Sequence, residues 1–93
     1  MGKSLLSDDK RCWICGNPNV EKHHIFMGNP NRNLSEAYGC YCYLCHNHHT
    51  GTNESVHHNH ALDVLLKKQA QRRWEQVHGN REQFIAIFGR SYL

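Results

Sequence analysis

The clearest pattern of hydrophobic and polar positions runs from residue 60 to residue 78. Apolar side chains recur there at spacings of three and four, which places them along one face of an α-helix. Asn59 is a suitable N-cap before the segment, and Gly79 is a suitable stop after it. The apolar positions are Leu62, Leu65, Leu66, Ala70, Trp74 and Val77. The pattern therefore predicts one long amphipathic helix.

A second, shorter helix is predicted directly after the first. Asn80 and Gln83 have the spacing of a capping box, and Gly89 marks the end of a segment that runs through Phe88. The basic residues of the long helix occupy its other faces, where they are either solvated or in contact with phosphate. These residues are Lys67, Lys68, Arg72 and Arg73.

Two short strands are predicted ahead of the helices, over 20–27 and 40–44. In the second strand the cysteines at 40 and 42 share one face, as expected of small buried thiols. A loop over 28–33 and one helical turn over 34–38, capped by Ser35, connect the strands. Residues 46–53 contain glycine and asparagine, which discourage regular structure, so an irregular segment is expected there.

Size and cysteine content restrict the class of protein. Ninety-three residues suit one domain, 1–93, with 1–11 as a mobile arm, and a chain this short often needs a metal or a disulfide for stability. Five cysteines are an odd number, and no signal peptide is recognisable, so reduced thiols in the cytoplasm are expected. No segment approaches the roughly 20 apolar residues of a membrane helix, so no membrane association is expected.

Charge and aromatic content add less information. The formal net charge is +3, which is compatible with nucleic-acid binding without requiring it. The large aromatic side chains are interpreted as packing groups rather than base-stacking platforms: Trp13, Phe26, Tyr41, Trp74, Phe84 and Phe88. Most of the nine histidines lie between residues 23 and 60, and this clustering points to a site. Three of the nine are interpreted as surface residues: His46, His60 and His78.

Two cysteine-containing pairs predict a structural zinc site. Cys12 and Cys15 form a CxxC knuckle, which grips a tetrahedral zinc ion from one side. The second pair is either Cys45 with His48 or Cys42 with Cys45, since both have the same gap. Because strand alternation assigns Cys42 to a buried face, we predict the site as Cys12, Cys15, Cys45 and His48.

The adjacent histidines 23 and 24 predict a second site. Neighbouring strand residues point to opposite faces, so the two rings have different tasks. One ring can bind a metal ion, and the other can take a proton from water, because a neutral imidazole has a suitable pKa. A divalent ion beside a phosphate stabilises the charge that develops during phosphodiester hydrolysis.

The order of these motifs resembles that of the HNH endonucleases, which share the ββα-metal fold. The resemblance lies in the CxxC knuckle, in His-His-Ile at 23–25, in an Asn-containing loop, and in Leu-Cys-x-x-His-His at 44–49. In many members a metal-binding histidine directly follows the last zinc ligand. The chain is also similar to small phage and prophage proteins of this type, and more distantly to the nuclease domain of the phage recombination-enhancing protein Ref.

The resemblance implies residue roles in the second site. His23 and His49 match metal ligands, and His24 matches the general base. The family's helix normally follows soon after the last metal histidine, but Gly51 and its neighbours interrupt it here. We therefore assign His57 as a further ligand that the helix entry supplies, with a plain surface histidine as the alternative and His58 as the next candidate ligand.

A second departure concerns the family's middle asparagine. It usually lies shortly before the second zinc pair, but no asparagine occurs over 38–44. Asn31 is assigned as the catalytic asparagine, with Asn33 as the alternative, and either could be a plain loop residue. Arg32, beside Asn31, is assigned to contact with nucleic acid.

Taken together, the resemblance implies an α+β, zinc-stabilised ββα-metal fold that carries a long and a short C-terminal helix. The expected activity is metal-dependent hydrolysis of DNA, with structural Zn²⁺ and a catalytic Mg²⁺, Mn²⁺ or Zn²⁺. The expected partners are DNA and a recombinase or phage DNA-processing protein in a bacterial host. Two rival interpretations remain: a non-catalytic zinc module that binds DNA or protein, and a domain in which the histidines complete a second structural zinc site.

Overall fold

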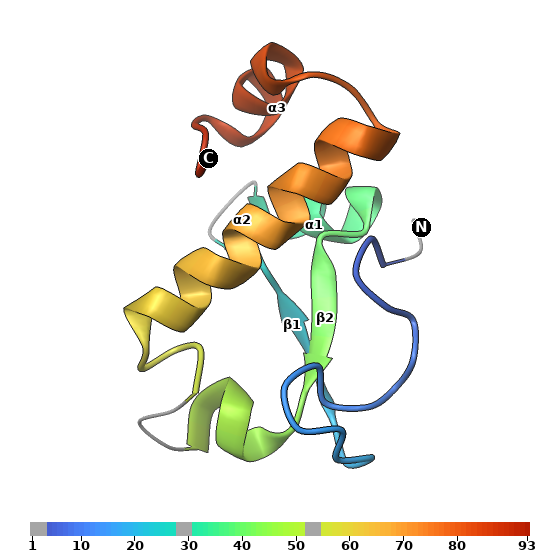
Figure 1. The fold of residues 1–93 in the computed structure, drawn as a ribbon, viewed down its shortest axis with the longest axis vertical. Helices are drawn as coiled ribbons and strands as arrows, with labels where there is room; N and C mark the ends of the chain where they lie inside the picture. Colours follow the sequence, from blue (N-terminus) through green and yellow to red (C-terminus); the bar gives the residue numbers. More distant parts are fainter. Residues whose placement is uncertain (1–3, 28–30, 52–54) are drawn as a thin grey trace.

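The computed structural model describes residues 4–27, 31–51 and 55–93, and within these ranges it is a small mixed α/β structure with a two-stranded sheet. The long helix α2 crosses in front of both strands, and α3 lies beyond one end of them (Figure 1). In chain order the elements are β1 (Glu21–His24), α1 (Asn31–Tyr38), β2 (Tyr41–Leu44), the π-helical turn η1 (Asn47–Gly51), α2 (His60–Val77) and α3 (Arg81–Phe88).

The sheet consists of β1 and β2 in antiparallel pairing, with Glu21 opposite Leu44 and His24 opposite Tyr41. Both strands were predicted, although each is shorter than expected. Cys40 and Cys42 are both buried, as predicted. The knuckle and η1 lie at the end of the sheet where β1 begins and β2 ends (Figure 1).

The connection between the strands differs from the prediction. Helix α1 already begins at Asn31, so residues 31–33 are helical rather than part of a loop, and 28–30 lie outside the described residues. Ser35 is a buried residue within the helix and does not cap it. Its hydroxyl donates to the backbone oxygen of Phe26 at 2.8 Å and accepts from the Phe26 N–H at 3.1 Å. These bonds satisfy backbone groups beyond the end of β1 and hold α1 against the strand.

Helix α2 begins and packs largely as predicted. The Asn59 side chain accepts a hydrogen bond from the backbone N–H of Leu62 at 3.1 Å, which confirms the N-cap. Leu66, Ala70 and Trp74, spaced four residues apart, enter the core. The other apolar positions differ: Leu62 packs against the core, whereas Leu65 and Val77 are exposed, because they lie around the helix from the line through 66, 70 and 74.

The C-terminal helix has the predicted caps. The Asn80 side chain accepts from the Gln83 N–H, and the Gln83 side chain accepts from the Asn80 N–H, which is the expected capping box. Gly89 ends α3 with φ +95°, a conformation that favours glycine. The buried Gln71 of α2 then accepts from the backbone N–H of Tyr92 at 2.7 Å, so the last residues are held against α2.

The core combines side chains from the sheet, α2 and α3. Of the aromatic residues predicted to pack, five are buried and one is not: Phe26, Tyr41, Trp74, Phe84 and Phe88 are buried, while Trp13 is 41% exposed. The prediction for Trp13 was wrong because a knuckle this tight points the residue between its cysteines toward solvent. Within the described part of the chain, no helix is both long and apolar enough to cross a membrane.

The N-terminal segment contacts the start of β2. The Leu5 N–H donates to the Gly39 oxygen at 2.8 Å, and the Ser4 hydroxyl donates to the Tyr41 oxygen at 2.6 Å. Residues 1–3 of the predicted arm lie outside the described residues. The contacts of 4–6 are more extensive than a free arm requires, while the mobility of 1–11 stays a prediction.

Candidate metal centres

The knuckle is built by short-range backbone hydrogen bonds and is attached to the sheet. The Gly16 N–H donates to the Cys12 oxygen at 2.8 Å, and Gly16 has φ +78°, which side-chain-bearing residues rarely adopt. The Trp13 N–H donates to the Tyr43 oxygen at 2.8 Å. The loop that carries Cys12 and Cys15 is therefore fixed relative to β2, which leads directly into Cys45.

The two predicted cysteine-containing pairs meet in one group that could hold a metal ion: Cys12, Cys15, Cys45 and His48. Cys15 Sγ lies 3.7 Å from Cys45 Sγ, and His48 Nδ1 lies 3.5 Å from Cys12 Sγ and 3.2 Å from Cys45 Sγ. Tetrahedral zinc bond lengths imply roughly 3.8 Å between two sulfurs and roughly 3.5 Å between sulfur and nitrogen. The spacing of the four side chains thus suits a tetrahedral ion.

The thiols inside and outside this group have different electrostatic surroundings. Burial alone would raise the pKa of Cys12, but backbone N–H groups at Cys45, Cys15 and Ile14 lower it to about 6, which favours the thiolate that metals bind. Burial raises the pKa of Cys42 to about 12, so this thiol stays protonated. The structure therefore places His48, and not Cys42, with the other three ligands.

A second group consists of three histidines from three segments: His23 of β1, His49 of η1, and His57 ahead of α2. One ring nitrogen from each lies within 4.8 Å of the others. The ring centroid of His23 lies 5.2 Å from that of His49 and 5.3 Å from that of His57. The backbone N–H of His57 donates to the His49 oxygen at 3.4 Å, which ties the segment before α2 to η1. The three residues predicted to bind a second ion are thus brought together.

His23 provides the test of whether a metal ion suits this group. Its side chain is 1% exposed, and neither Nδ1 nor Nε2 has a hydrogen-bond partner among the described residues. Burial, together with the neighbouring His49 and His57, lowers the pKa of His23 to about 3, so the ring is neutral. An unsatisfied buried polar group costs about 1–3 kcal/mol. A metal ion bound to a ring nitrogen would remove much of that cost, so the residues fit an ion.

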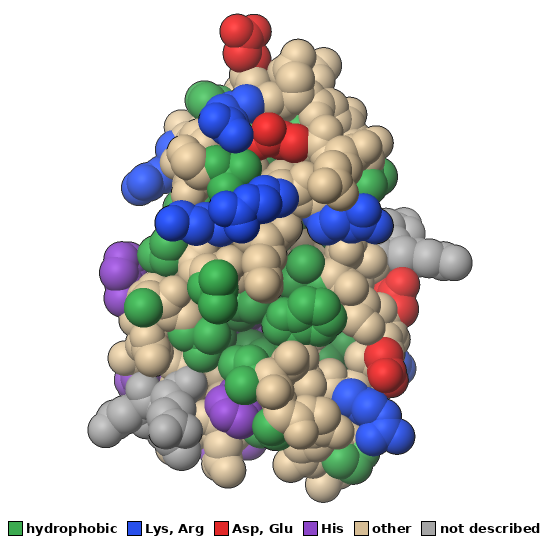
Figure 2. Space-filling view, viewed as in Figure 1, with side chains coloured by type: hydrophobic (Ala, Val, Ile, Leu, Met, Phe, Trp, Pro, Cys, Tyr) green, Lys and Arg blue, Asp and Glu red, His purple; other side chains and the backbone are tan. Residues whose placement is uncertain are grey.

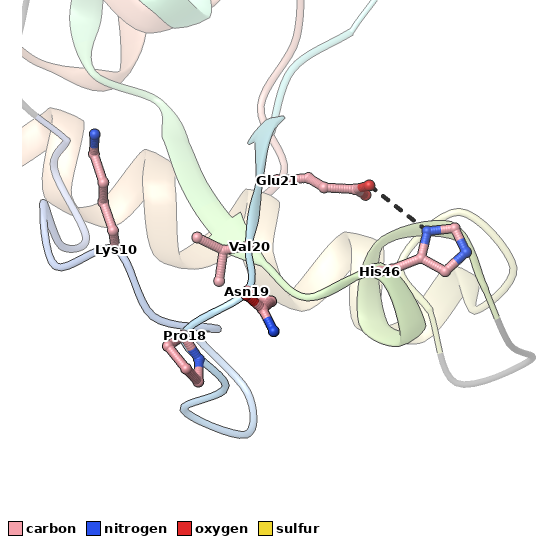
Figure 3. Close-up of a pocket in the computed structure, with 6 residues that line it drawn as sticks. All are labelled: Lys10, Pro18, Asn19, Val20, Glu21 and His46. Atoms are coloured by element: carbon pink, nitrogen blue, oxygen red, sulfur yellow. Dashed lines mark ion pairs between the residues drawn. The ribbon is translucent and has the colours of Figure 1, made fainter.

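Glu21 supports the group from the same strand. Its carboxylate accepts a hydrogen bond from His49 Nδ1 at 2.8 Å, which leaves Nε2 of that ring for a metal ion. The bond from His49 lowers the pKa of Glu21, so the carboxylate stays charged. Figure 3 shows the Glu21 side chain extending toward His46, whose Nδ1 lies 3.6 Å from the other carboxylate oxygen. Glu21 therefore orients the ring of a candidate ligand.

Replacing Glu21 with glutamine should weaken metal binding at the histidine group. An amide is a poorer acceptor for the His49 N–H, and loss of such a partner typically lowers metal affinity about 10–100-fold. A competition titration with a metal-binding dye would measure the affinity. Glu82→Gln, which removes an exposed carboxylate at the start of α3, is the control. An equal affinity for both variants would contradict the role given to Glu21.

His24 has different partners from His23, as strand alternation predicted. Its Nε2 lies 2.8 Å from the Glu36 carboxylate of α1, and Lys22 donates to the same carboxylate at 3.0 Å. Lys22 first and His24 second lower the pKa of Glu36, so this group is charged. With Nε2–H donated to Glu36, Nδ1 of His24 is the nitrogen left to accept a proton.

The remaining predicted residues are more peripheral. Asn31 donates from Nδ2 to the Phe88 backbone oxygen at 3.4 Å, and Arg32 is exposed on α1. Their roles in catalysis and in nucleic-acid contact stay predictions. His58 is exposed and outside the histidine group of the described residues. The three predicted surface histidines are indeed exposed: His46, His60 and His78.

Sequence reasoning missed Glu21 and Glu36. Glu21 lies two residues before His23, so the period of a strand could have placed both on one face. No local spacing connects Glu36 with His24, because their contact depends on how α1 packs against β1. The segment at 47–51 was expected to be irregular, but it forms the π-helical turn η1, and residues 52 and 53 lie outside the described residues.

Comparison with known proteins identifies no relative of the chain: no protein-family model matches it, and neither does any curated protein or solved structure. The functional interpretation therefore depends on the two side-chain groups and on their surroundings. One group could hold a structural metal ion at the end of the sheet, and the other brings three histidines together next to it.

Proposed function

We propose that the chain is a metal-dependent endonuclease of the HNH type, with a ββα-metal fold, that hydrolyses phosphodiester bonds in DNA. The observation that carries the proposal is the convergence of His23, His49 and His57, with His24 adjacent in the chain and paired with a carboxylate. A scaffold protein needs one ion for stability. A second group of candidate ligands, around a buried ring that has no hydrogen-bond partner in the described part of the chain, suits a chemical task better.

In this proposal the ion held by the cysteine group is zinc. Three thiol ligands and one imidazole suit zinc among the common cellular metals, and closed four-ligand sites are typical of structural zinc. This ion fixes the knuckle to the start of η1. Because His49 directly follows His48, the structural ion also sets the position of one ligand of the second group.

His24 acts as the general base. The Glu36 carboxylate holds the ring in the tautomer with a proton on Nε2, so Nδ1 can accept a proton from the attacking water. Lys22 keeps Glu36 charged, and its ammonium lies 4.2 Å from the centre of the Tyr41 ring, which restrains this side of the sheet. Such an arrangement of base and orienting carboxylate recurs in enzymes that activate water or hydroxyl groups.

The histidine group complements this base. A divalent ion there, Mg²⁺, Mn²⁺ or Zn²⁺, would neutralise the negative charge that builds up on the phosphate. The chain's own contribution is to keep the His23 ring neutral, to bring the three rings together, and to hold His49 in the correct tautomer through Glu21. Three neutral ligands leave the ion its full positive charge, which suits an anionic substrate.

The surface is compatible with DNA as substrate. On the face of Figure 2, lysine and arginine side chains form a row across the upper half, with hydrophobic side chains directly below it and separate histidine side chains lower down and at the left edge. Basic residues near a metal group would contact the phosphate backbone without reading the base sequence. We therefore propose cleavage with little sequence discrimination, directed in a phage or prophage setting by a recombinase or another DNA-processing protein.

Plasmid cleavage with a panel of divalent ions tests the proposal. We expect His24→Ala to lower the cleavage rate about 10²–10⁴-fold, which is the usual contribution of a general base. Metal content and melting temperature should stay close to those of the unmodified chain, because His24 lies outside both ligand groups. His78→Ala, which removes an exposed histidine at the end of α2, is the control and should cleave normally.

The same experiment distinguishes the rival interpretations. Absence of cleavage with every ion, together with one bound metal per chain, would favour a non-catalytic zinc module that binds DNA or protein. Two metals per chain that resist chelators, again without cleavage, would favour a second structural site. Cleavage that persists in His24→Ala would reject His24 as the base.

A further inference from the structure

A hollow of about 380 Å³ lies directly beside the histidine group. It is bordered by Met27, which follows β1, and by residues from the entry and first turns of α2. His57 belongs both to this hollow and to the histidine group, so the two are continuous. The remaining lining residues are Val56, His58, His60, Asp63 and Lys67.

Lys67 differs from an ordinary solvated lysine on a helix. Only 21% of its side chain is exposed, and its ammonium lies 2.8 Å from the Asp63 carboxylate and 5.3 Å from the centre of the Tyr92 ring. Lys67 also lines the same hollow as His57, which belongs to the histidine group. Lys67 is therefore a positioned cation at the edge of this group.

The charges in the hollow suit a singly charged anion. An ammonium group has three N–H donors, and Asp63 accepts from one of them, so two remain for a ligand. The Asp63 carboxylate would repel an anion, but Lys67 offsets its charge. With an ion on the neighbouring rings, the combined site is positive. A phosphodiester carries one negative charge and several acceptor oxygens, which matches this environment.

We propose that the hollow binds a phosphate of the DNA strand, with Lys67 Nζ donating to a non-bridging oxygen. This inference rests on the proposed nuclease function and adds the residue that positions the substrate. The phosphate would lie between Met27 and the start of α2, next to His57. Lys67 would hold the strand there without identifying its bases.

Lys68 offers a matched comparison. It has the same charge and length and lies one residue further along α2. It lines a different hollow, together with Ala61, Val64 and Leu65. Substitutions at both positions remove the same charge from the same helix, so they separate a specific contact from a general attraction between the protein and DNA.

The experiment measures binding of a fluorescently labelled DNA duplex at several salt concentrations, without added Mg²⁺ or Mn²⁺. We expect Lys67→Met to weaken binding about tenfold, as for loss of a hydrogen bond to a charged group. The slope of log K against log salt should fall by about one. Lys68→Met should change both quantities much less, and Lys67→Arg should restore most of the affinity. Metal content and melting temperature show whether each variant folds, and Lys67→Gln replaces Lys67→Met if that variant does not.

Each outcome has a defined meaning. Equal weakening by Lys67→Met and Lys68→Met would overturn the inference in favour of general attraction. An unmodified chain that does not bind the duplex would also overturn it. If the unmodified chain cleaves DNA and Lys67→Met binds the duplex fully, the proposed phosphate site in the hollow is rejected and the proposed nuclease function is kept. If DNA binding depends on Lys67 but no cleavage occurs, the phosphate site in the hollow is supported and the proposed nuclease function is rejected.

Discussion

Replacing Cys45 with alanine should leave the chain largely unfolded under conditions in which the unmodified chain is folded. Binding of a structural zinc ion contributes apparent free energies of about 10–16 kcal/mol in small zinc domains. The total stability of a domain is typically about 5–15 kcal/mol, so the loss of one ligand can exceed it. Circular dichroism and the metal content of the purified protein would show the effect.

Cys42→Ala is the matched control for this experiment. Cys42 and Cys45 are three residues apart and both buried, so each substitution removes one sulfur atom from the interior. If packing alone mattered, the two variants would lose similar stability. We expect Cys42→Ala to stay folded with a full complement of metal, since its protonated thiol lies outside the ligand group. Similar losses in both variants would contradict a structural metal at Cys45.

Replacing His23 with leucine should abolish DNA cleavage while preserving or raising the stability of the chain without the second ion. Leucine has a similar size and removes two buried nitrogens that have no hydrogen-bond partner among the residues that the structure describes. Removal of such an unsatisfied buried group raises the free energy of unfolding by about 1–3 kcal/mol. The same change deletes the central ligand of the histidine group, so the second metal should no longer bind. Stability and function are expected to change in opposite directions.

Chemical denaturation without added divalent ions would measure the first effect, and metal content with plasmid cleavage would measure the second. His78→Leu is a suitable control, because His78 is exposed and outside the histidine group. It should change neither metal binding nor stability by more than about 0.5 kcal/mol. A large loss of stability in His23→Leu with the second metal retained would show that the ring has a packing role instead.

The sequence predicted the features that depend on local spacing. The gaps between Cys12 and Cys15, and between Cys45 and His48, are the gaps that suit a tetrahedral ion, so this group could be predicted from the sequence without knowledge of the fold. Helix caps are equally local, and Asn59 and Asn80 both cap as expected. The convergence of the three histidines was also predicted, although their ligand roles came from a resemblance to a family.

The features that depend on tertiary packing were missed. Serine is a common helix N-cap, and Ser35 was predicted as one for that reason. Its hydroxyl instead forms hydrogen bonds with the backbone groups of Phe26, a contact that no local sequence pattern reveals. Helix α1 also begins earlier than predicted, at Asn31. The pairing of His24 with Glu36 follows from the same docking. Leu65 was predicted to lie on the apolar face of the long helix because it is hydrophobic and correctly spaced, but it is exposed. Helix periodicity gives the direction of the buried face and does not give its width.

His48 belongs to the cysteine-containing group and His49 to the histidine group, and the two residues are adjacent in the chain. Loss of one ion is therefore expected to disturb the other site. An oxidant that consumed the thiols would release the first ion and free the turn that carries His49, so the neighbouring group would also come apart. In the proposed nuclease, activity would then decline as the thiols are oxidised, even though the proposal gives no cysteine a contact with the substrate. Reducing agents during purification would protect both ions together.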